Sequence, residues 1–163
     1  MNKVFLLIGG NIGDRLQNLH QAITGLSAVC GPVIQQSAVY ETAAWGKTDQ
    51  AAFLNQALLL TTSLTAQELI TTILSVEEEM GRRRMEKFGP RVIDIDILFF
   101  NEEIINEPNL IIPHPQLQNR RFALAPMHEI APALVHPVLH KTIEQLLAEC
   151  PDELPVRKLE NEE

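Results

Sequence analysis

Runs of apolar residues separated by turn signals divide the first forty residues into a strand, a helix and a second strand. Residues 4–8 form a continuous apolar run, which predicts a strand buried on both faces. The sequence Gly9-Gly10-Asn11 ends this run, and Asp14 then occupies a helix N-cap position before apolar residues at helical spacing. The β-branched residues over 33–40 predict the second strand.

The next forty residues predict a loop, a third strand and a second helix. Residues 41–52 are interpreted as a loop, and the apolar stretch over 53–62 predicts a strand. Thr65 is followed three residues later by Glu68, which is a capping-box pattern. Helical spacing then continues to about Met80, so a helix is predicted over this stretch, and Gly81 fits the position just after its end.

The last part of the chain begins with a strand pattern and becomes less regular. Residues 92–100 alternate and then become apolar, which predicts a strand. Residues 101–121 are interrupted by three prolines and are interpreted as irregular. Short helices are predicted over 122–130 and 142–150, and the polar segment after them is expected to be loosely held.

The order of these elements is β-α-β-β-α-β, followed by extra C-terminal helices. This order is typical of the α+β class with a ferredoxin-like split β-α-β core, in which helices cover one face of a mostly antiparallel sheet. We expect one domain over residues 1–150, followed by an acidic C-terminal tail over 151–163.

The composition is that of an ordinary globular domain. Of the 163 residues, 45% are hydrophobic and 21% are charged, and this length is enough to bury one core. No apolar run approaches the ~18–20 residues that cross a bilayer, so no membrane partner is expected. Two sparse cysteines, Cys30 and Cys150, fit a reducing compartment. We therefore expect a cytoplasmic protein.

The formal net charge of −8 argues against a nucleic-acid partner, because affinity for duplexes comes largely from basic surface. One segment departs from this acidic background. Residues 82–91 contain five cations and one carboxylate, a net charge of +4. A basic segment of this kind needs an explanation of its own.

The strand predicted over 92–100 carries two aspartates at alternate positions. Residues i and i+2 of a strand share a face, so Asp94 and Asp96 should project together while the intervening isoleucines face the helices. Paired carboxylates suit Mg²⁺, which usually takes one or two of them together with substrate phosphates. Two metal ions ~3.5–4 Å apart fit between such side chains. The alternative is a half-solvated strand with acidic residues facing outward.

Cations flank this aspartate pair in the sequence. Arg91 lies three residues before Asp94, and three consecutive arginines begin at Arg82. Carboxylates that hold metal ions beside guanidinium groups match the needs of phosphate transfer, which are charge neutralisation and positioning. The alternative for the arginines is a solvated helix end whose cations complement the helix dipole.

The segment 87–98, Lys-Phe-Gly-Pro-Arg-Val-Ile-Asp-Ile-Asp-Ile-Leu, resembles the signature of the 6-hydroxymethyl-7,8-dihydropterin pyrophosphokinase family. The resemblance extends over most of the chain and ends near residue 150. The further segments that carry it are Gly9-Gly10-Asn11, Glu41-Thr42, Phe53-Leu54-Asn55, Glu77, Gly81-Arg82, Pro113-His114, Asn119-Arg120 and Phe122.

The resemblance implies transfer of pyrophosphate from ATP to the hydroxymethyl group of the pterin in folate biosynthesis, with release of AMP. It implies that Asp94 and Asp96 hold two Mg²⁺ ions and that Arg82 and Arg91 are catalytic together with them. The positions that match ATP-binding residues are Glu77, Arg82, Arg84, Arg91, Ile97, His114 and Arg120.

The pterin partner implied by the resemblance is a flat heterocycle that needs stacking surfaces and polar edge contacts. The positions that match pterin-binding residues are Thr42, Ala43, Trp45, Phe53, Asn55 and Phe122. Phe53 and Phe122 match the two stacking positions, for which the alternative is core packing. Asn55 matches the edge-binding amide, and a polar amide in an apolar strand is unfavourable unless it is paired.

Two other functions remain as alternatives. A two-metal phosphodiesterase would also use paired aspartates with arginines, and a non-catalytic ferredoxin-like module would bind a ligand without turnover. For the pyrophosphokinase, the expected partners are ATP and a reduced pterin, and the expected state is a monomer.

Overall fold

The structure is a computed structural model that describes residues 1–43, 51–81 and 92–159. The strands are β1 (Asn2–Gly10), β2 (Val33–Gln36), β3 (Tyr40–Thr42), β4 (Phe53–Thr62), β5 (Asp94–Phe100), β6 (Ile105–Glu107), β7 (Leu110–Ile112) and β8 (Val156–Lys158). The helices are α1 (Arg15–Val29), α2 (Ala66–Glu79), α3 (Arg121–Ile130) and α4 (Ile143–Ala148), with a 3₁₀ turn at Leu117–Asn119. Within these residues, no helix is long and apolar enough to cross a membrane.

The main sheet is antiparallel at every pairing between its described strands. Its order is β5-β1-β4-β3-β8, and β2 also pairs with β4. Strands β2 and β3 lie along successive parts of β4, so together they form the second strand of the predicted β-α-β-β-α-β order. The predicted ferredoxin-like α+β fold is therefore confirmed.

Local signals in the sequence account for the ends of both long helices. The Asp14 side chain accepts a hydrogen bond from the backbone N–H of Gln17 at the start of α1. Thr65 and Glu68 form the complete capping box predicted for α2. The third strand begins and ends where the apolar stretch over 53–62 predicts it.

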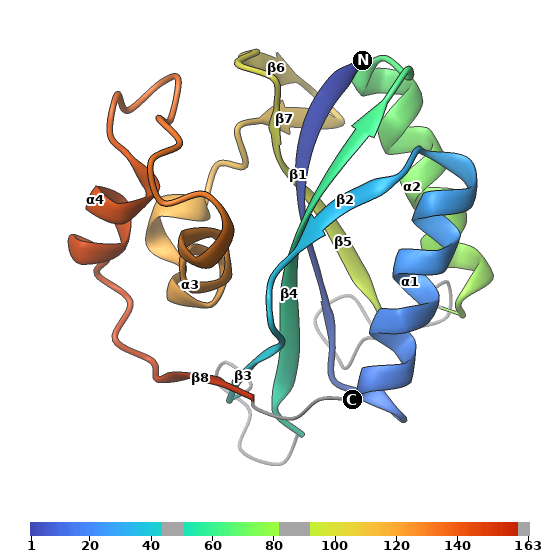
Figure 1. Cartoon of the computed structure of the whole chain (residues 1–163), viewed down its shortest axis with the longest axis horizontal. Coiled ribbons are helices and arrows are strands. Elements are labelled where there is room, and N and C mark those ends of the chain that lie inside the picture. The colour runs from blue at the N-terminus through green and yellow to red at the C-terminus, as the bar shows by residue number, and fades with distance from the viewer. Residues whose placement is uncertain (44–50, 82–91, 160–163) are drawn as a thin grey trace.

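Helices cover both faces of the sheet, which corrects the expectation of helices on one face. Helices α1 and α2 lie on one side of the sheet and α3 and α4 on the other (Figure 1). Leu6 and Leu58 pack in the cluster beneath α1 and α2, whereas Leu7 and Ala57 pack in the cluster beneath α3 and α4. Because β1 and β4 carry apolar side chains on both faces, each face needs its own cover.

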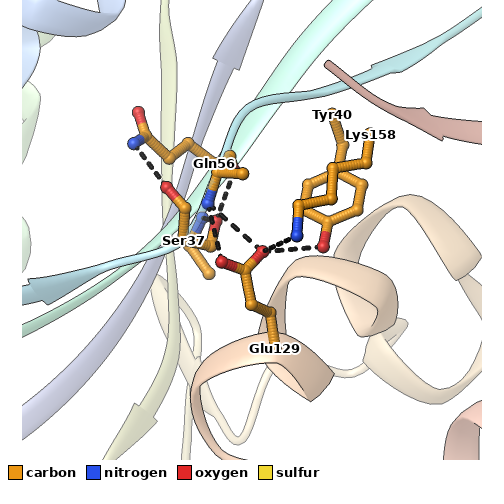
Figure 2. A network of polar contacts seen from close by, with 7 residues as sticks. Ser37, Tyr40, Gln56, Glu129 and Lys158 are labelled. Carbon is orange, nitrogen blue, oxygen red and sulfur yellow. Dashed lines mark hydrogen bonds and ion pairs between the residues drawn. The ribbon is translucent and has the colours of Figure 1, made fainter. Parts of the chain in front are cut away.

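The strand predicted over 33–40 is interrupted at Ser37. The Ser37 hydroxyl accepts a hydrogen bond from the N–H of Ala57 at 3.0 Å and donates one to the carbonyl of Ala38 at 2.7 Å. The Gln56 amide donates to the Ser37 carbonyl at 2.8 Å (Figure 2). The Ser37 hydroxyl thus takes the place of a backbone carbonyl as the acceptor for Ala57 N–H. Serine side chains commonly compete in this way with the backbone hydrogen bonds of a sheet.

Two segments interpreted as irregular contain regular structure. Within 101–121, β6 and β7 form an antiparallel hairpin and a 3₁₀ turn follows. In the segment interpreted as a loop, Glu41 and Thr42 belong to β3. Short strands of three residues carry too weak a hydrophobic period to be recognised beside prolines or polar neighbours.

The expectation of a loosely held C-terminal tail is wrong for residues 156–158. These residues form β8, which pairs with β3 in the register Tyr40↔Lys158 and Thr42↔Val156. The backbone N–H of Leu159 also donates to the carbonyl of Val39 at 2.8 Å. Without β8, the short strand β3 would be an unpaired sheet edge, so pairing satisfies its backbone groups.

Candidate active site

Strand β5 presents its aspartates and isoleucines on opposite faces, as the alternation predicts. Ile93, Ile95 and Ile97 are buried in the cluster beneath α1 and α2. Asp94 and Asp96 alternate with them, are half-buried and already have polar or charged contacts in the structure. The strand period places both carboxylates on the sheet face away from α1 and α2.

Pairing across the sheet places Asp94 in one row with Asn55. Asp94 pairs with Gly9 of β1, Gly9 pairs with Asn55 of β4, and Asn55 pairs with Tyr40 of β3. Directly opposite residues in antiparallel strands point to the same face. The row therefore joins the aspartate pair to the strand that carries the proposed pterin amide.

Gly9 leaves the space that the Asn55 side chain occupies. A Cβ atom at Gly9 would lie 2.2 Å from Asn55 Oδ1 and 2.6 Å from the carbonyl oxygen of Leu54. Asn55 is a buried polar residue, 6% exposed, on a strand whose neighbouring side chains are mostly apolar. An amide held at this close approach to a glycine backbone is a candidate for a ligand contact, because buried polar groups need hydrogen-bonding partners.

Glu77 of α2 lies behind the aspartate pair. Its Oε2 accepts a 2.6 Å hydrogen bond from the backbone N–H of Ile95, and the Glu77 side chain is buried. Ile95 lies between the two aspartates, so this contact fixes the strand that carries both. The contact shown in the structure is therefore to the backbone of β5.

Ile97 has a buried side chain, so a ligand could reach it only through its backbone. Strand β5 is at the edge of the sheet, and the N–H of Ile95 donates to Glu77. Hydrogen-bonding direction repeats every two residues in an antiparallel strand, so the peptide groups of Ile97 face the same outer edge. This arrangement is compatible with the predicted backbone contact to adenine.

His114 follows β7 and is held beside the end of β5. Its backbone N–H donates to the carbonyl of Leu98 at 3.1 Å, and its Nδ1 accepts from the N–H of Gln116 at 3.1 Å. Burial, and secondarily the positive charge of Arg120, lowers the pKa of His114 to about 4. The ring is therefore neutral near pH 7, and its remaining Nε2–H is a donor.

Arg120 and Phe122 contact each other at the start of α3. The Arg120 guanidinium lies over the Phe122 ring, 5.7 Å from its centroid, in a cation–π contact. Phe122 is half-buried and packs against the cluster beneath α3 and α4. One part of its surface thus serves the core while another part stays exposed, so core packing and stacking on a ligand are compatible.

The remaining described pterin candidates lie on β3 and β4. Phe53 is half-buried and pairs with Thr42, whose hydroxyl donates to the carbonyl of Pro155 at 3.4 Å. Ala43 follows β3 and is exposed. Helix α3 packs against β3 and β4, so Phe53, Thr42 and Phe122 come from neighbouring elements.

Several predicted residues cannot be placed by this geometry. Trp45, Arg82, Arg84 and Arg91 lie outside the residues that the structure describes. Their predicted roles rest on the sequence resemblance alone.

The carboxylates available for a metal ion are those of β5. Within residues 1–43, 51–81 and 92–159, no group of three or more His, Cys, Asp and Glu side chains could hold a metal. Two half-exposed carboxylates on one face are suitable ligands for Mg²⁺, because this ion completes its coordination shell with water and with oxygens of substrate phosphates. The donor set does not resemble a closed structural metal site.

Sequence reasoning missed the role of Gly9 and the charged cluster around Glu41. Gly9 ends a predicted strand and belongs to a segment that carries the resemblance, but its close approach to Asn55 depends on a pairing that the sequence does not show. Glu41 binds Arg15 of α1 and Arg157 of β8, which are far apart in sequence. A buried strand that ends in two glycines was the available signal for close backbone approach.

Comparisons with known proteins agree with this fold and with the family resemblance of the sequence. A family model described as 7,8-dihydro-6-hydroxymethylpterin-pyrophosphokinase (HPPK) matches residues 5–132. The 2-amino-4-hydroxy-6-hydroxymethyldihydropteridine pyrophosphokinase of Aquifex aeolicus is 42% identical over 149 residues, which are 91% of this chain and 92% of that protein. The protein of the same name from Bacillus subtilis is 43% identical over 130 residues, covering 79% of this chain and 78% of the relative.

The fold also matches a solved structure. Wild-type HPPK-DHPS of Plasmodium falciparum, crystallised with SDX-DHP, matches with a TM-score of 0.74 at 20% sequence identity. The match covers 91% of this chain, which spans 43% of the length of the Plasmodium protein. At 20% sequence identity, this structural similarity supports the assignment of the fold alone.

Fold and comparisons together define the class as a kinase that transfers pyrophosphate and uses ATP as co-substrate. The chain belongs to the 7,8-dihydro-6-hydroxymethylpterin-pyrophosphokinase family. The predicted activity, pyrophosphate transfer in folate biosynthesis, is confirmed at this level. The phosphodiesterase and the non-catalytic module are not favoured.

Proposed function

We propose that the chain transfers the β,γ-pyrophosphate of ATP to the hydroxymethyl oxygen of 6-hydroxymethyl-7,8-dihydropterin. The substrate oxygen forms a bond to the β-phosphorus, the bond from that phosphorus to the α,β-bridging oxygen breaks, and AMP leaves with that oxygen. The hydroxyl proton passes to solvent. The observation that carries the proposal is the single sheet row that joins Asp94 to Asn55 across Gly9.

Asp94 and Asp96 are the proposed holders of two Mg²⁺ ions. Both side chains are half-buried on one face of β5, and carboxylate oxygens are the ligands that Mg²⁺ prefers. When bound, the metal supplies charge neutralisation for the triphosphate and orientation of the attacking hydroxyl. The hydrogen bond from Ile95 to Glu77 keeps the strand between these carboxylates fixed.

The proposed nucleotide side runs from the outer edge of β5 to the start of α3. Arg82, Arg84 and Arg91 are proposed to bind phosphate oxygens, for which the guanidinium fork is suited. His114 offers a neutral N–H donor, and Arg120 offers a positive charge beside it. The backbone of Ile97 would contact adenine, and Glu77 would contribute by holding that backbone.

We call the proposed pterin-binding residues the pterin side of the site. They are Asn55, the two aromatic residues Phe53 and Phe122, and Thr42, Ala43 and Trp45. Phe53 and Phe122 are proposed to stack on the ring, and the Asn55 amide to pair with its polar edge. Thr42 and Ala43, together with Trp45, would complete the edge contacts through their backbone groups. This assignment gives the Asn55 amide the hydrogen-bonding partners that a buried amide needs.

A monomer in the cytoplasm is the proposed working state. Cys30 and Cys150 are both buried free thiols, which suits a reducing compartment. Burial raises the pKa of Cys30 to about 11, so its thiol is unreactive near neutral pH. One catalytic domain over 1–150 remains the predicted organisation, with β8 contributed by the segment that follows.

The proposal is tested by identifying the products formed from ATP, Mg²⁺ and 6-hydroxymethyl-7,8-dihydropterin. Chromatography should find AMP and a pyrophosphorylated pterin in equal amounts. Formation of ADP with a monophosphorylated pterin would contradict pyrophosphate transfer. AMP formation that does not depend on the pterin would instead favour a phosphodiesterase or hydrolase.

A further inference from the structure

Strand β3 carries part of the proposed pterin side and depends on its neighbours for its position. It has three residues, and it lies between β4 and β8. Thr42 pairs with Phe53 and Tyr40 pairs with Asn55, so β3 borders two of the proposed pterin residues. A displacement of β3 would therefore shift the proposed pterin-binding residues before it affected the proposed ATP-binding residues.

On the face of the sheet that carries α1, Glu41 joins β3 to two other elements. Its carboxylate binds Arg15 of α1 at 3.1 Å and also binds Arg157 of β8. Burial acts to raise the pKa of Glu41, but the hydrogen bonds from Arg157 and Arg15 outweigh it, so the pKa is lowered. Arg15 also donates to the carbonyl of Ala52 at 2.7 Å, next to Phe53.

On the opposite face, Glu129 of α3 holds β3 in a second polar cluster. Its carboxylate accepts from the Tyr40 hydroxyl at 2.7 Å and from the Ala38 N–H at 3.1 and 3.2 Å (Figure 2). The Nζ of Lys158 on β8 lies 4.0 Å from the same carboxylate. Consecutive residues of β8 thus place their cations on opposite faces of the sheet, Arg157 against Glu41 of β3 and Lys158 against Glu129 of α3.

We propose that the C-terminal strand β8 is a positioning element for pterin binding. Arg157 binds Glu41 of β3 directly, Lys158 reaches β3 through Glu129 and Tyr40, and the Thr42 hydroxyl donates to the Pro155 carbonyl. These are the two cations of an otherwise acidic C-terminal segment, and they lie beyond residues 5–132 that the family model matches. This inference rests on the proposed pterin side.

A purely structural role for β8 makes a different prediction. If β8 only stabilised the fold, its disruption would lower the concentration of active enzyme and leave both Michaelis constants unchanged. A positioning role instead raises KM for the pterin selectively, because β3 borders the pterin residues and not the β5 edge proposed for ATP. The split between the two constants therefore distinguishes the two roles.

The test compares Arg157→Glu with Lys141→Glu in the full chain. Arg157→Glu places a second carboxylate against Glu41 and should push β8 away from β3. Lys141 pairs with Glu149 in another exposed ion pair, so its reversal changes the net charge equally without touching β3. Arg157→Lys keeps the charge and serves as the conservative rescue.

We expect Arg157→Glu to raise KM for the pterin about three- to tenfold, while KM for ATP stays within about twofold. Lys141→Glu and Arg157→Lys should resemble the wild type. Should Arg157→Glu fail to fold, Arg157→Gln should give the same selective effect at about two- to threefold. Equal pterin constants for wild type and the folded Arg157 variant, or a parallel rise for both substrates, would overturn the positioning role.

Failure of this inference is separable from failure of the proposed function. A wild-type chain that makes no pyrophosphorylated pterin contradicts the proposed function. An active wild type whose pterin KM is unaffected by Arg157→Glu contradicts only the role of β8.

Discussion

The Glu77 carboxylate on α2 accepts a 2.6 Å hydrogen bond from the backbone N–H of Ile95 on β5. Ile95 separates Asp94 from Asp96, so one buried side chain holds the strand at the midpoint of the aspartate pair. The same residue resembles an ATP-contacting position in sequence. The structure adds a role in positioning the two carboxylates, which links helix packing to the proposed metal site.

Replacing Glu77 with alanine should lower the free energy of unfolding by about 1–3 kcal/mol, because the Ile95 N–H would lose its buried acceptor. Turnover should fall as well, since β5 carries both aspartates. Glu78→Ala is the matched control, because Glu78 is exposed on the same helix and its removal should change stability by less than about 0.5 kcal/mol. Urea unfolding compares the two, and equal midpoints would contradict the anchoring role of Glu77.

Gly9→Ala should weaken pterin binding, because the new Cβ would lie 2.2 Å from Asn55 Oδ1 and displace the amide. We expect KM for the pterin to rise about tenfold or more, equivalent to about 1.4 kcal/mol. Steady-state kinetics with each substrate varied in turn provide the measurement.

Gly25→Ala controls for the loss of a glycine. Gly25 lies within α1, where an added Cβ would meet Val76 Cγ1 at 3.4 Å, an ordinary to slightly tight contact. Alanine is favoured over glycine inside a helix by about 0.8–1.0 kcal/mol, so this variant should be as stable as the wild type or more stable. If Gly9→Ala bound the pterin as well as Gly25→Ala, the role assigned to the Gly9–Asn55 approach would be wrong.

The lowered pKa of His114 predicts how stability depends on pH. The folded ring titrates at about 4 and an unfolded histidine near 6.5, so only the unfolded chain binds this proton at intermediate pH. The free energy of unfolding should therefore fall as pH is lowered from 6.5 to 4. Because His114 is partly exposed, we expect its contribution to be about 1–2 kcal/mol.

His114→Gln isolates this contribution from that of His136. Burial, and secondarily the charge of His140, lowers the pKa of His136, so this residue adds a slope of the same sign. Urea unfolding between pH 4 and 7.5 should show a smaller loss of stability in His114→Gln than in the wild type. An identical loss in both proteins would contradict the neutral, buried state of His114.

Local features of the fold were predictable from the sequence, and features set by distant pairing were not. The capping box of Thr65 and Glu68 and the apolar length of β4 are each contained in a few neighbouring residues. By contrast, β8 is short and polar, and it exists through its pairing with β3 more than 110 residues earlier. No hydrophobic period marks such a strand before its partner is known.

The candidate site likewise contains some features that follow from neighbouring residues and others that depend on distant pairing. The shared face of Asp94 and Asp96 follows from the two-residue strand period alone. The approach of Asn55 to Gly9 depends on the register of β1 with β4, and the contact of Glu77 with Ile95 depends on how α2 packs on β5. The sequence could therefore predict the carboxylates and, by resemblance, name Glu77 and Asn55, but it could not predict the contacts that place these two residues beside the carboxylates.

Removal of Mg²⁺ should abolish turnover, because two carboxylates and a triphosphate need positive charge between them. Chelation should leave the fold intact, since the proposed metal ligands are half-exposed and no closed metal cage occurs among the described residues. Circular dichroism and activity measured with and without chelator provide the check. Full turnover after chelation would remove the metal role assigned to Asp94 and Asp96.

The most direct measurement follows the β-phosphorus of ATP labelled at that position, using the wild type and Asp96→Asn. The account predicts that the wild type moves the label to the pterin and none to AMP. It also predicts that Asp96→Asn keeps the fold but transfers label at least about a hundredfold more slowly. Label left in a nucleotide product, or a rate for folded Asp96→Asn equal to that of the wild type, would contradict pyrophosphate transfer at this aspartate pair.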